Sequence, residues 1–203
     1  MNAAVACPAT VYYLTRAWPG RLTADQLFEI CQALGLEEVG AKEQLFRRIY
    51  REVGYREGWL PRSVDVPARF HKATVLPFLR WYPLLKVPDR EKDLYDSFAV
   101  EMTELFTEKN VHEQFPVAYG AALKIDFHIG HPNEGGVGIE FKMPKSNSEV
   151  QRALGQVDQY LVHYRDDLIV IFIPAYLKTA DKQNFLDELA RKNIEVVLWE
   201  LVV

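Results

Sequence analysis

Two short runs that alternate polar and apolar residues constrain the fold most strongly. Residues 123–129 read LKIDFHI and residues 137–144 read VGIEFKMP. Successive side chains of a strand point to opposite faces, so the pattern predicts two β-strands, each with one polar and one apolar face. The residues between them, HPNEGG at 131–136, are typical of a turn. An antiparallel hairpin is therefore expected.

The hairpin is expected to gather charged side chains on one face. Lys124, Asp126 and His128 share a face of the first run, and Glu140 and Lys142 share a face of the second. Two carboxylates beside a lysine suit a hard divalent cation, because Mg²⁺ binds oxygen ligands from one or two carboxylates and shares its remaining positions with water and phosphate. We expect Asp126 and Glu140 to bind Mg²⁺, for which Mn²⁺ can substitute, and Lys142 to assist an attacking water.

At these residues the sequence resembles the PD-(D/E)XK, or restriction-endonuclease-like, nucleases. Asp126 matches the first acid of the family pattern, residues 140–142 match its E-x-K element, and Ile125 stands where the pattern has a proline. Residues 156–160, QVDQY, match the Q-x-x-x-Y element of the RecB-like branch. The resemblance covers residues 89–203. It implies a magnesium-dependent nuclease acting on DNA, in which Gln156 positions substrate or the metal-bound water. Aromatic residues of a helix more often pack in a core than act in catalysis, so Tyr160 is expected mainly to pack.

Two other interpretations fit the same residues. An acid followed by a Glu-x-Lys pair is also common on an ordinary half-exposed sheet, where the charges are simply solvated. A nucleic-acid-binding or assembly subunit can keep the nuclease fold without cutting. The order of acid, turn, Glu-x-Lys, a helix with Gln156 and Tyr160 and the apolar run 168–173 favours the nuclease. DNA against RNA, and endonuclease against exonuclease action, stay open.

The segment before the hairpin has the pattern of a helix. Asp89 is expected to cap it, and it runs to about Glu108 with an apolar stripe of Leu94, Phe98, Met102 and Leu105. The nucleases that the sequence resembles often add an acid from this helix to the metal site. Glu91 and Glu101 both lie at the edge of the stripe, and the sequence does not choose between them.

The remaining elements of the C-terminal part give the fold class. Expected strands are 111–119, 168–173 and 194–203, and expected helices start after Ser146 or Ser148 and cover 181–192. This order predicts an α/β fold with a mixed central sheet flanked by helices, the αβββαβ core of restriction-endonuclease-like proteins.

A small helical module is expected at the N-terminus. Thr23 and Gln26 form a capping box, an apolar stripe follows, and Gly35 ends the helix. A second helix is expected over 42–53, with Gly54 as its end. Residues 22–49 resemble a SAP motif, which implies DNA binding with Lys42, Arg47 and Arg48 as phosphate contacts. The alternative is a plain helical hairpin.

The stretch between these parts is rich in proline and aromatic residues. Seven basic and three acidic residues between 55 and 90 give it a charge of 7 − 3 = +4. Basic residues interleaved with aromatic residues suit a surface that follows phosphates and stacks bases. Proline at this density favours an extended segment, and the preferred alternative is an ordered arm with Phe78, Trp81 and Tyr82 buried. The predicted division is therefore a helical module at 1–54, a basic connecting arm at 55–88 and a nuclease-like domain at 89–203.

Composition limits the protein classes. The chain has 203 residues, of which 49% are hydrophobic and 26% charged, as in ordinary globular proteins. The net charge of −4 provides no general attraction to nucleic acid, so any interface must be a local patch. Cys7 and Cys31 lack ligand spacing, and no run is long enough to span a membrane. We expect a cytoplasmic protein, with a homodimer or a partner protein as a possible source of specificity.

Overall fold

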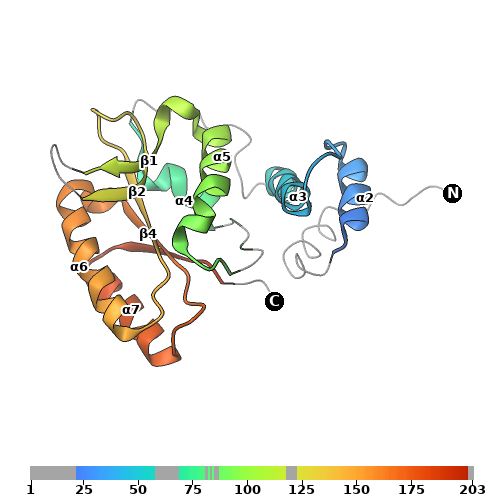
Figure 1. The fold of residues 1–203 in the computed structure, drawn as a ribbon. Coiled ribbons are helices and arrows are strands. Elements are labelled where there is room, and N and C mark those ends of the chain that lie inside the picture. The colour runs from blue at the N-terminus through green and yellow to red at the C-terminus, as the bar shows by residue number, and fades with distance from the viewer. Residues whose placement is uncertain are drawn as a thin grey trace. The chain divides into compact units, whose positions relative to one another are not determined.

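A computed structural model describes residues 22–57, 69–80, 82, 84, 87–117 and 123–200. Two compact units are present (Figure 1). Residues 22–57 and 84 belong to the N-terminal unit, whereas 69–80, 82, 87–117 and 123–200 belong to the C-terminal unit.

The N-terminal unit begins with the predicted helix, α2 (Ala24–Leu34). The capping box is confirmed: the Gln26 amide donates to Thr23 Oγ1 over 3.2 Å, and the Thr23 amide donates to Gln26 Oε1 over 2.8 Å. Gly35 ends the helix with a φ of 71°, a conformation that glycine adopts without strain. Leu27 and Cys31 are fully buried.

The second helix, α3 (Lys42–Glu57), runs past Gly54, so its predicted end at this residue was wrong. A glycine inside a helix costs only about 1 kcal/mol relative to alanine. Two contacts around Gly54 offset this cost: Val53 is buried, and the Arg56 guanidinium donates to the Leu34 carbonyl over 3.0 Å. The apolar side of α3 is buried as predicted at Leu45, Phe46 and Ile49.

A five-stranded mixed sheet forms the centre of the C-terminal unit. Its order is β1-β2-β3-β4-β5, with β1–β2 and β2–β3 antiparallel and β3–β4 and β4–β5 parallel. The strands are β1 (Val111–Pro116), β2 (Lys124–Ile129), β3 (Val137–Lys142), β4 (Leu168–Phe172) and β5 (Glu195–Leu198). The predicted hairpin and α/β class with a mixed sheet are confirmed, and every residue of β4 is buried.

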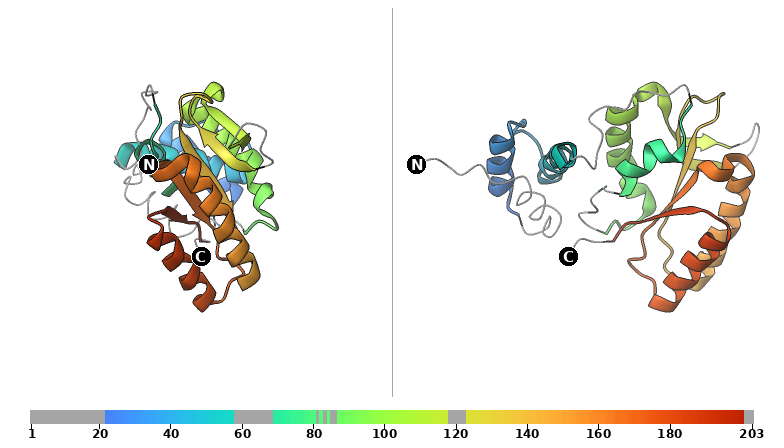
Figure 2. Two further views of the ribbon diagram at one scale, coloured as in Figure 1. Left: turned by 90° about the vertical axis from the view of Figure 1, so that its left-hand side faces the viewer. Right: turned by 180° about the vertical axis from the view of Figure 1, so that it is seen from behind.

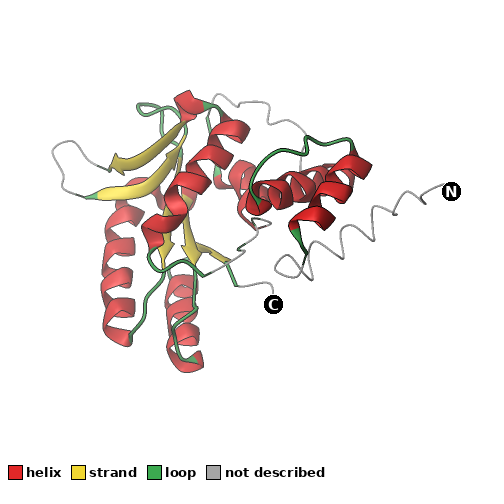
Figure 3. Ribbon diagram, turned by 45° about the vertical axis from the view of Figure 1, so that its right-hand side comes forward, coloured by secondary structure: helices red, strands yellow, loops and turns green. Residues whose placement is uncertain are grey.

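Helices cover both faces of this sheet (Figures 1 and 3). On one face, Phe98 packs against Phe127 and Phe141 with ring centroids 4.7 and 5.1 Å apart. On the other, a cluster that includes Val157 and Phe185 packs against β4, and Figure 2 shows the two helices of this face beside the sheet. The helices are α4 (Lys72–Arg80), α5 (Tyr95–Phe106), α6 (Asn147–Tyr164) and α7 (Thr179–Arg191), with short 3₁₀ turns at Glu91–Leu94, Glu108–Asn110 and Arg165–Asp167.

Helix α4 corrects the expectation of an extended arm. It contains Pro77, which cannot donate a backbone hydrogen bond inside a helix. Burial of the neighbouring Phe78 and Leu79 offsets this loss, and Trp199 Nε1 donates to the Leu79 carbonyl over 2.9 Å. Residues 69–80 thus group with the C-terminal unit. The predicted burial of Phe78 is confirmed, Tyr82 is half-buried, and Trp81 lies outside the described residues.

Two helix caps in the C-terminal unit differ in outcome. Asp89 does not cap the helix before β1, because a 3₁₀ turn precedes α5 and the Arg90 amide donates to Asp93 Oδ2 over 2.9 Å. Of the two candidate serines before α6, Ser146 is the cap and accepts from the Glu149 amide over 3.4 Å. No described helix combines the length and apolar character required to cross a membrane.

Candidate functional site

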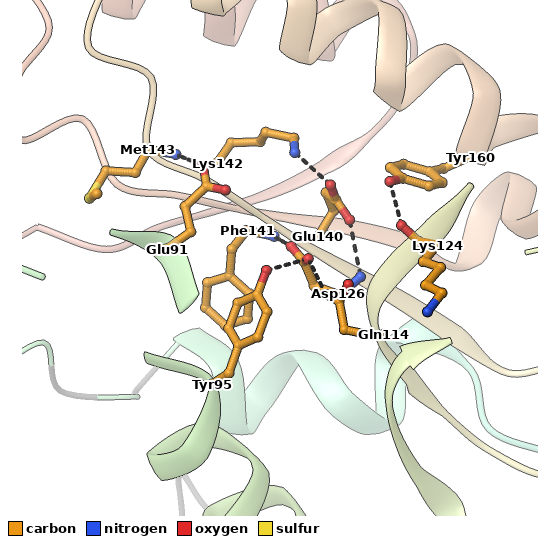
Figure 4. Close-up of polar contacts among 10 residues, drawn as sticks. All are labelled: Glu91, Tyr95, Gln114, Lys124, Asp126, Glu140, Phe141, Lys142, Met143 and Tyr160. Carbon is orange, nitrogen blue, oxygen red and sulfur yellow. Dashed lines mark hydrogen bonds and ion pairs between the residues drawn. The ribbon is translucent and has the colours of Figure 1, made fainter. Parts of the chain in front are cut away.

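Four polar side chains of the hairpin, Lys124, Asp126, Glu140 and Lys142, line a cavity of about 290 Å³ in the C-terminal unit. His128, which was expected on the same face, does not line it and contacts the Tyr164 hydroxyl instead. Asp126, Glu140 and Lys142 point toward one another there (Figure 4). Acidic, basic and amide groups make up most of the lining, which comprises Glu91, Gln114, Lys124, Asp126, Glu140, Lys142, Pro144, Glu149, Arg152, Ala153, Gln156 and Tyr160. The cavity therefore joins residues of β1, β2, β3 and α6.

Three donors hold the Asp126 carboxylate. Oδ1 accepts from the Tyr95 hydroxyl and from Gln114 Nε2, the latter over 3.0 Å. Oδ2 accepts from the Phe141 backbone amide over 2.8 Å. Both carboxylate oxygens are thus oriented by neighbouring elements, as Figure 4 shows.

Glu140 and Lys142 form a buried ion pair. Lys142 Nζ lies 2.5 Å from Glu140 Oε1, and the two side chains are only 8% and 4% exposed for Lys142 and Glu140 respectively. The Asp126 amide donates to Glu140 Oε2 over 3.2 Å. Burial raises the pKa of Glu140 above its ordinary value, and the charge of Lys142 opposes that rise. The predicted meeting of Asp126, Glu140 and Lys142 is confirmed.

The strict alternation predicted for β2 is wrong around Asp126. Ile125 packs in the cluster of α6, whereas Phe127 packs on Phe98 of α5. The β2–β3 pairing covers only Phe127 to Ile129, because the Asp126 amide donates to the side chain of Glu140. Side-chain hydrogen bonds thus replace the ladder at the point where the cavity lies.

The structure distinguishes the two acids of the preceding helical segment. Glu91 lines the cavity, and its Oε1 accepts from the Met143 amide over 2.6 Å. Burial raises the pKa of Glu91 above its ordinary value, and the positive charge of Lys142 only partly opposes this rise. Glu101 is not among the residues that line the cavity.

Helix α6 contributes one row of side chains to the cavity. Arg152, Gln156 and Tyr160 are spaced by four residues and all line it. Tyr160 is 2% exposed, and its hydroxyl donates to the Lys124 carbonyl over 2.7 Å, which agrees with the packing role predicted for it. Gln156 is half-buried on the same wall.

Sequence reasoning missed Tyr95, Gln114 and Arg152. The spacing of four between Arg152 and Gln156 and between Glu91 and Tyr95 was a usable signal, because such residues share a helix face. No local pattern indicates Gln114, since its place beside Asp126 depends on the pairing of β1 with β2.

The candidate phosphate contacts of the N-terminal unit lie on α3. Lys42 is the first residue of this helix, and Arg47 is half-buried. The Arg48 guanidinium donates to the Glu37 carbonyl over 3.1 Å and to the Val39 carbonyl, and it lies 3.3 Å from Glu37 Oε2. Arg48 therefore organises the loop between α2 and α3.

His128, on the same strand as Asp126, predicts a pH dependence of stability. Its Nδ1 lies 3.0 Å from the Tyr164 hydroxyl, and burial lowers the pKa of His128 to about 4. The pKa of histidine in an unfolded chain is about 6.5. Between about pH 4 and about pH 6.5, the unfolded chain therefore binds the proton more readily than the folded protein does. Stability is therefore complete above pH ~6.5 and falls as the pH decreases toward about 4.

We expect His128→Phe to remove this dependence. Between pH 7.5 and 5, wild-type protein should lose about 2 kcal/mol of unfolding free energy more than the variant loses. Urea unfolding at the two pH values measures the difference. Equal losses in both proteins would contradict the assignment to His128.

The donor set suits a hard cation. Within the described residues, no three carboxylate, imidazole or thiol side chains already stand in a metal-ligating arrangement. Asp126 and Glu140 nevertheless provide carboxylate oxygens at one wall of the cavity, with Glu91 also in the lining. Mg²⁺ requires only one or two carboxylates and keeps several waters, so these residues fit it.

Comparisons of the chain with protein-family models, with curated proteins and with solved structures find no match.

Proposed function

We propose that this protein is a metal-dependent nuclease that hydrolyses phosphodiester bonds, with DNA as the favoured substrate. The observation that carries the proposal is the convergence of Asp126, Glu140 and Lys142 in one polar cavity. The element order supports it as well, because α5, β1, β2, β3, α6 and β4 follow one another as in an αβββαβ core.

In this proposal Asp126 and Glu140 bind the cation, and Glu91 stands beside them as a further acid. A bound Mg²⁺ would polarise the phosphoryl oxygen and make water a stronger nucleophile. Lys142 is oriented by its contact with Glu140 Oε1 and has further donor hydrogens available. These can orient the attacking water and offset the negative charge that develops on the phosphoryl group. Gln156 can hydrogen-bond substrate or water from α6.

The lining favours recognition of the phosphate backbone over recognition of bases. Its apolar members are Pro144 and Ala153, and the aromatic ring of Tyr160 is buried with its hydroxyl engaged. A base needs an exposed aromatic or apolar face for stacking. The lining charges are −4 from Glu91, Asp126, Glu140 and Glu149 and +3 from Lys124, Lys142 and Arg152. Their sum of −1 becomes +1 with one divalent cation, which suits a phosphate.

Lys124 and Arg152 are the expected phosphate contacts. Both side chains are exposed, and neither has a hydrogen-bond or ion-pair partner within the described ranges, although the charge of Arg152 acts on Glu91. Lys142, in contrast, is paired with Glu140. Two unpaired cations at the rim of the cavity can bind phosphates beside the one that is cut.

We expect Lys124→Ala and Arg152→Ala each to weaken DNA binding about tenfold at low salt and to reduce the slope of log K against log salt by about 0.7 to 0.9. Fluorescence anisotropy in Ca²⁺ over a salt series measures both quantities. Arg191→Ala is the matched control, because Arg191 is paired with Glu188 on α7 and does not line the cavity. An unchanged slope in both variants would exclude these contacts.

Cleavage of DNA tests the proposed function directly. Linear and circular, single- and double-stranded substrates are incubated with Mg²⁺, Mn²⁺ or chelator. We expect cutting that requires the metal, and the circular substrates separate endonuclease from exonuclease action. Salt-sensitive binding without cutting would instead favour a nucleic-acid-binding subunit that keeps the fold. A protein that neither cuts nor binds these substrates would lead us to reject the proposal.

In the same proposal the N-terminal unit holds DNA through Lys42 and Arg47. Arg48 is expected to act indirectly, because its guanidinium binds the loop carbonyls of Glu37 and Val39.

A further inference from the structure

Gln114 lies beside the first acid of the site in an unusual backbone conformation. The pairs Glu113–Phe127 and Phe115–Ile125 flank it, so the register of β1 and β2 places Gln114 opposite Asp126. Its φ is +46°, in the left-handed region that a residue with a Cβ atom rarely occupies. A strand has no structural need for this conformation, which is favourable for glycine and unfavourable for glutamine.

The strained residue places a donor on Asp126. Gln114 Nε2 donates to Asp126 Oδ1 over 3.0 Å. Strained backbone at a candidate site persists only where surrounding contacts determine it and commonly has a functional role.

Tyr95 supplies a second donor to the same oxygen. Its hydroxyl donates to Asp126 Oδ1, while its ring packs against Phe127 and Phe141 with centroids 5.4 and 5.7 Å away. A phenolic hydroxyl has one hydrogen to donate, and in Tyr95 it is directed at this oxygen.

A count of acceptor positions gives the consequence. A carboxylate oxygen accepts about two hydrogen bonds. Oδ1 of Asp126 already accepts two, from Tyr95 and Gln114, whereas Oδ2 accepts one, from the Phe141 amide. One acceptor position of Asp126 is left, and it belongs to Oδ2.

We infer that Gln114 and Tyr95 are positioning residues that fix the Asp126 carboxylate so that it binds a divalent cation through Oδ2 alone. This inference rests on the proposed function. The two residues act through Asp126, and the unfavourable conformation of Gln114 is retained because it brings the amide to Oδ1.

Two substitutions of Gln114 separate strain from positioning. Gln114→Gly and Gln114→Ala both remove the amide donor, but only glycine relieves the positive φ. In the metal-free protein we expect the glycine variant to melt about 3 °C above the alanine variant. Glu113→Gly and Glu113→Ala are the control pair, since Glu113 does not have a positive φ. At position 113 we expect the alanine variant to be more stable than the glycine variant, as is usual for a residue with negative φ.

Binding of Mn²⁺ alone, measured by titration calorimetry, tests the positioning. Both Gln114 variants should bind it about tenfold more weakly than wild type, as is typical when the residue that orients a metal ligand is lost. Tyr95→Phe should have a similar effect, because it keeps the ring and removes only the donor. This variant also guards against a folding defect at Gln114.

The outcomes are distinguishable. Unchanged Mn²⁺ affinity in all three variants, with tight wild-type binding, would overturn the inference and leave the proposed function standing. If Gln114→Ala melts above Gln114→Gly, the claim that the backbone of Gln114 is held in an unfavourable conformation would be wrong. Wild-type protein that binds Mn²⁺ no better than Asp126→Asn would reject the proposed metal site itself, and this inference with it.

Discussion

Asp126→Asn is expected to reduce metal-dependent cleavage about a thousandfold, which corresponds to roughly 4 kcal/mol in the activation barrier. Asparagine removes one of the two anionic ligands proposed for the cation. It also brings an amide NH₂ among three donors, the Tyr95 hydroxyl, Gln114 Nε2 and the Phe141 amide. Two donors then face each other, and the side chain loses its fixed orientation. Initial rates at saturating Mg²⁺ measure the effect.

Asp158→Asn is the matched control for this substitution. Asp158 lies on α6 and is about half exposed, and its partner Lys192 has Nζ 2.5 Å from Asp158 Oδ1. Its side chain does not line the cavity. We expect wild-type rates from this control. A rate for Asp126→Asn within a factor of ten of wild type would remove Asp126 from the proposed mechanism.

Lys142→Met should destabilise the C-terminal unit by about 3 to 5 kcal/mol at pH 8, independently of any catalytic role. The substitution leaves the carboxylate of Glu140 buried without its cation. Burial already raises the pKa of Glu140, and loss of Lys142, which lowers it, must raise it further. In the variant, folded Glu140 then keeps a proton that the unfolded chain has already released. The loss of unfolding free energy therefore grows as the pH rises above the ordinary pKa of glutamate.

Chemical unfolding at pH 5 and pH 8 measures this penalty, which should be much smaller at pH 5. Lys192→Met is the control, because its pair with Asp158 has the same 2.5 Å separation but 28% and 52% exposed side chains. An exposed pair contributes only about 0 to 1 kcal/mol. A double substitution, Glu140→Gln with Lys142→Met, should recover part of the loss, since no buried charge remains. Equal penalties at Lys142 and Lys192 would contradict this account.

Local signals in the sequence predicted the elements that local interactions determine. The Thr23–Gln26 capping box and Gly35 set the bounds of α2, and the buried run 168–173 became β4. Glu140 and Lys142 share a face because β3 pairs regularly with β4 from Gly138 to Lys142. In each case the deciding contacts lie close in sequence or follow from strand periodicity.

Predictions failed where distant contacts outweigh local preference. Gly54 and Pro77 both lie inside helices, because burial of neighbouring side chains exceeds the cost of each residue. The alternation of β2 fails at Asp126, where the backbone amide donates to the Glu140 side chain and the β2–β3 pairing stops at Phe127. Glu91 differs from Glu101 in lining the cavity and in accepting from the Met143 amide, 52 residues away in the sequence, so no local signal could separate the two acids.

The hydrogen bond from Trp199 to Leu79 also has a consequence for the order of folding during synthesis. It joins positions 120 residues apart, and Lys72 likewise donates its amide to Asp167 Oδ1 across 95 residues. Helix α4 therefore leaves the ribosome long before the residues that hold it have been made. In the N-terminal unit the Arg56–Leu34 hydrogen bond spans only 22 residues. Contacts between α2 and α3 can therefore form early, while α4, with its apolar side exposed, needs protection from aggregation until Trp199 has emerged.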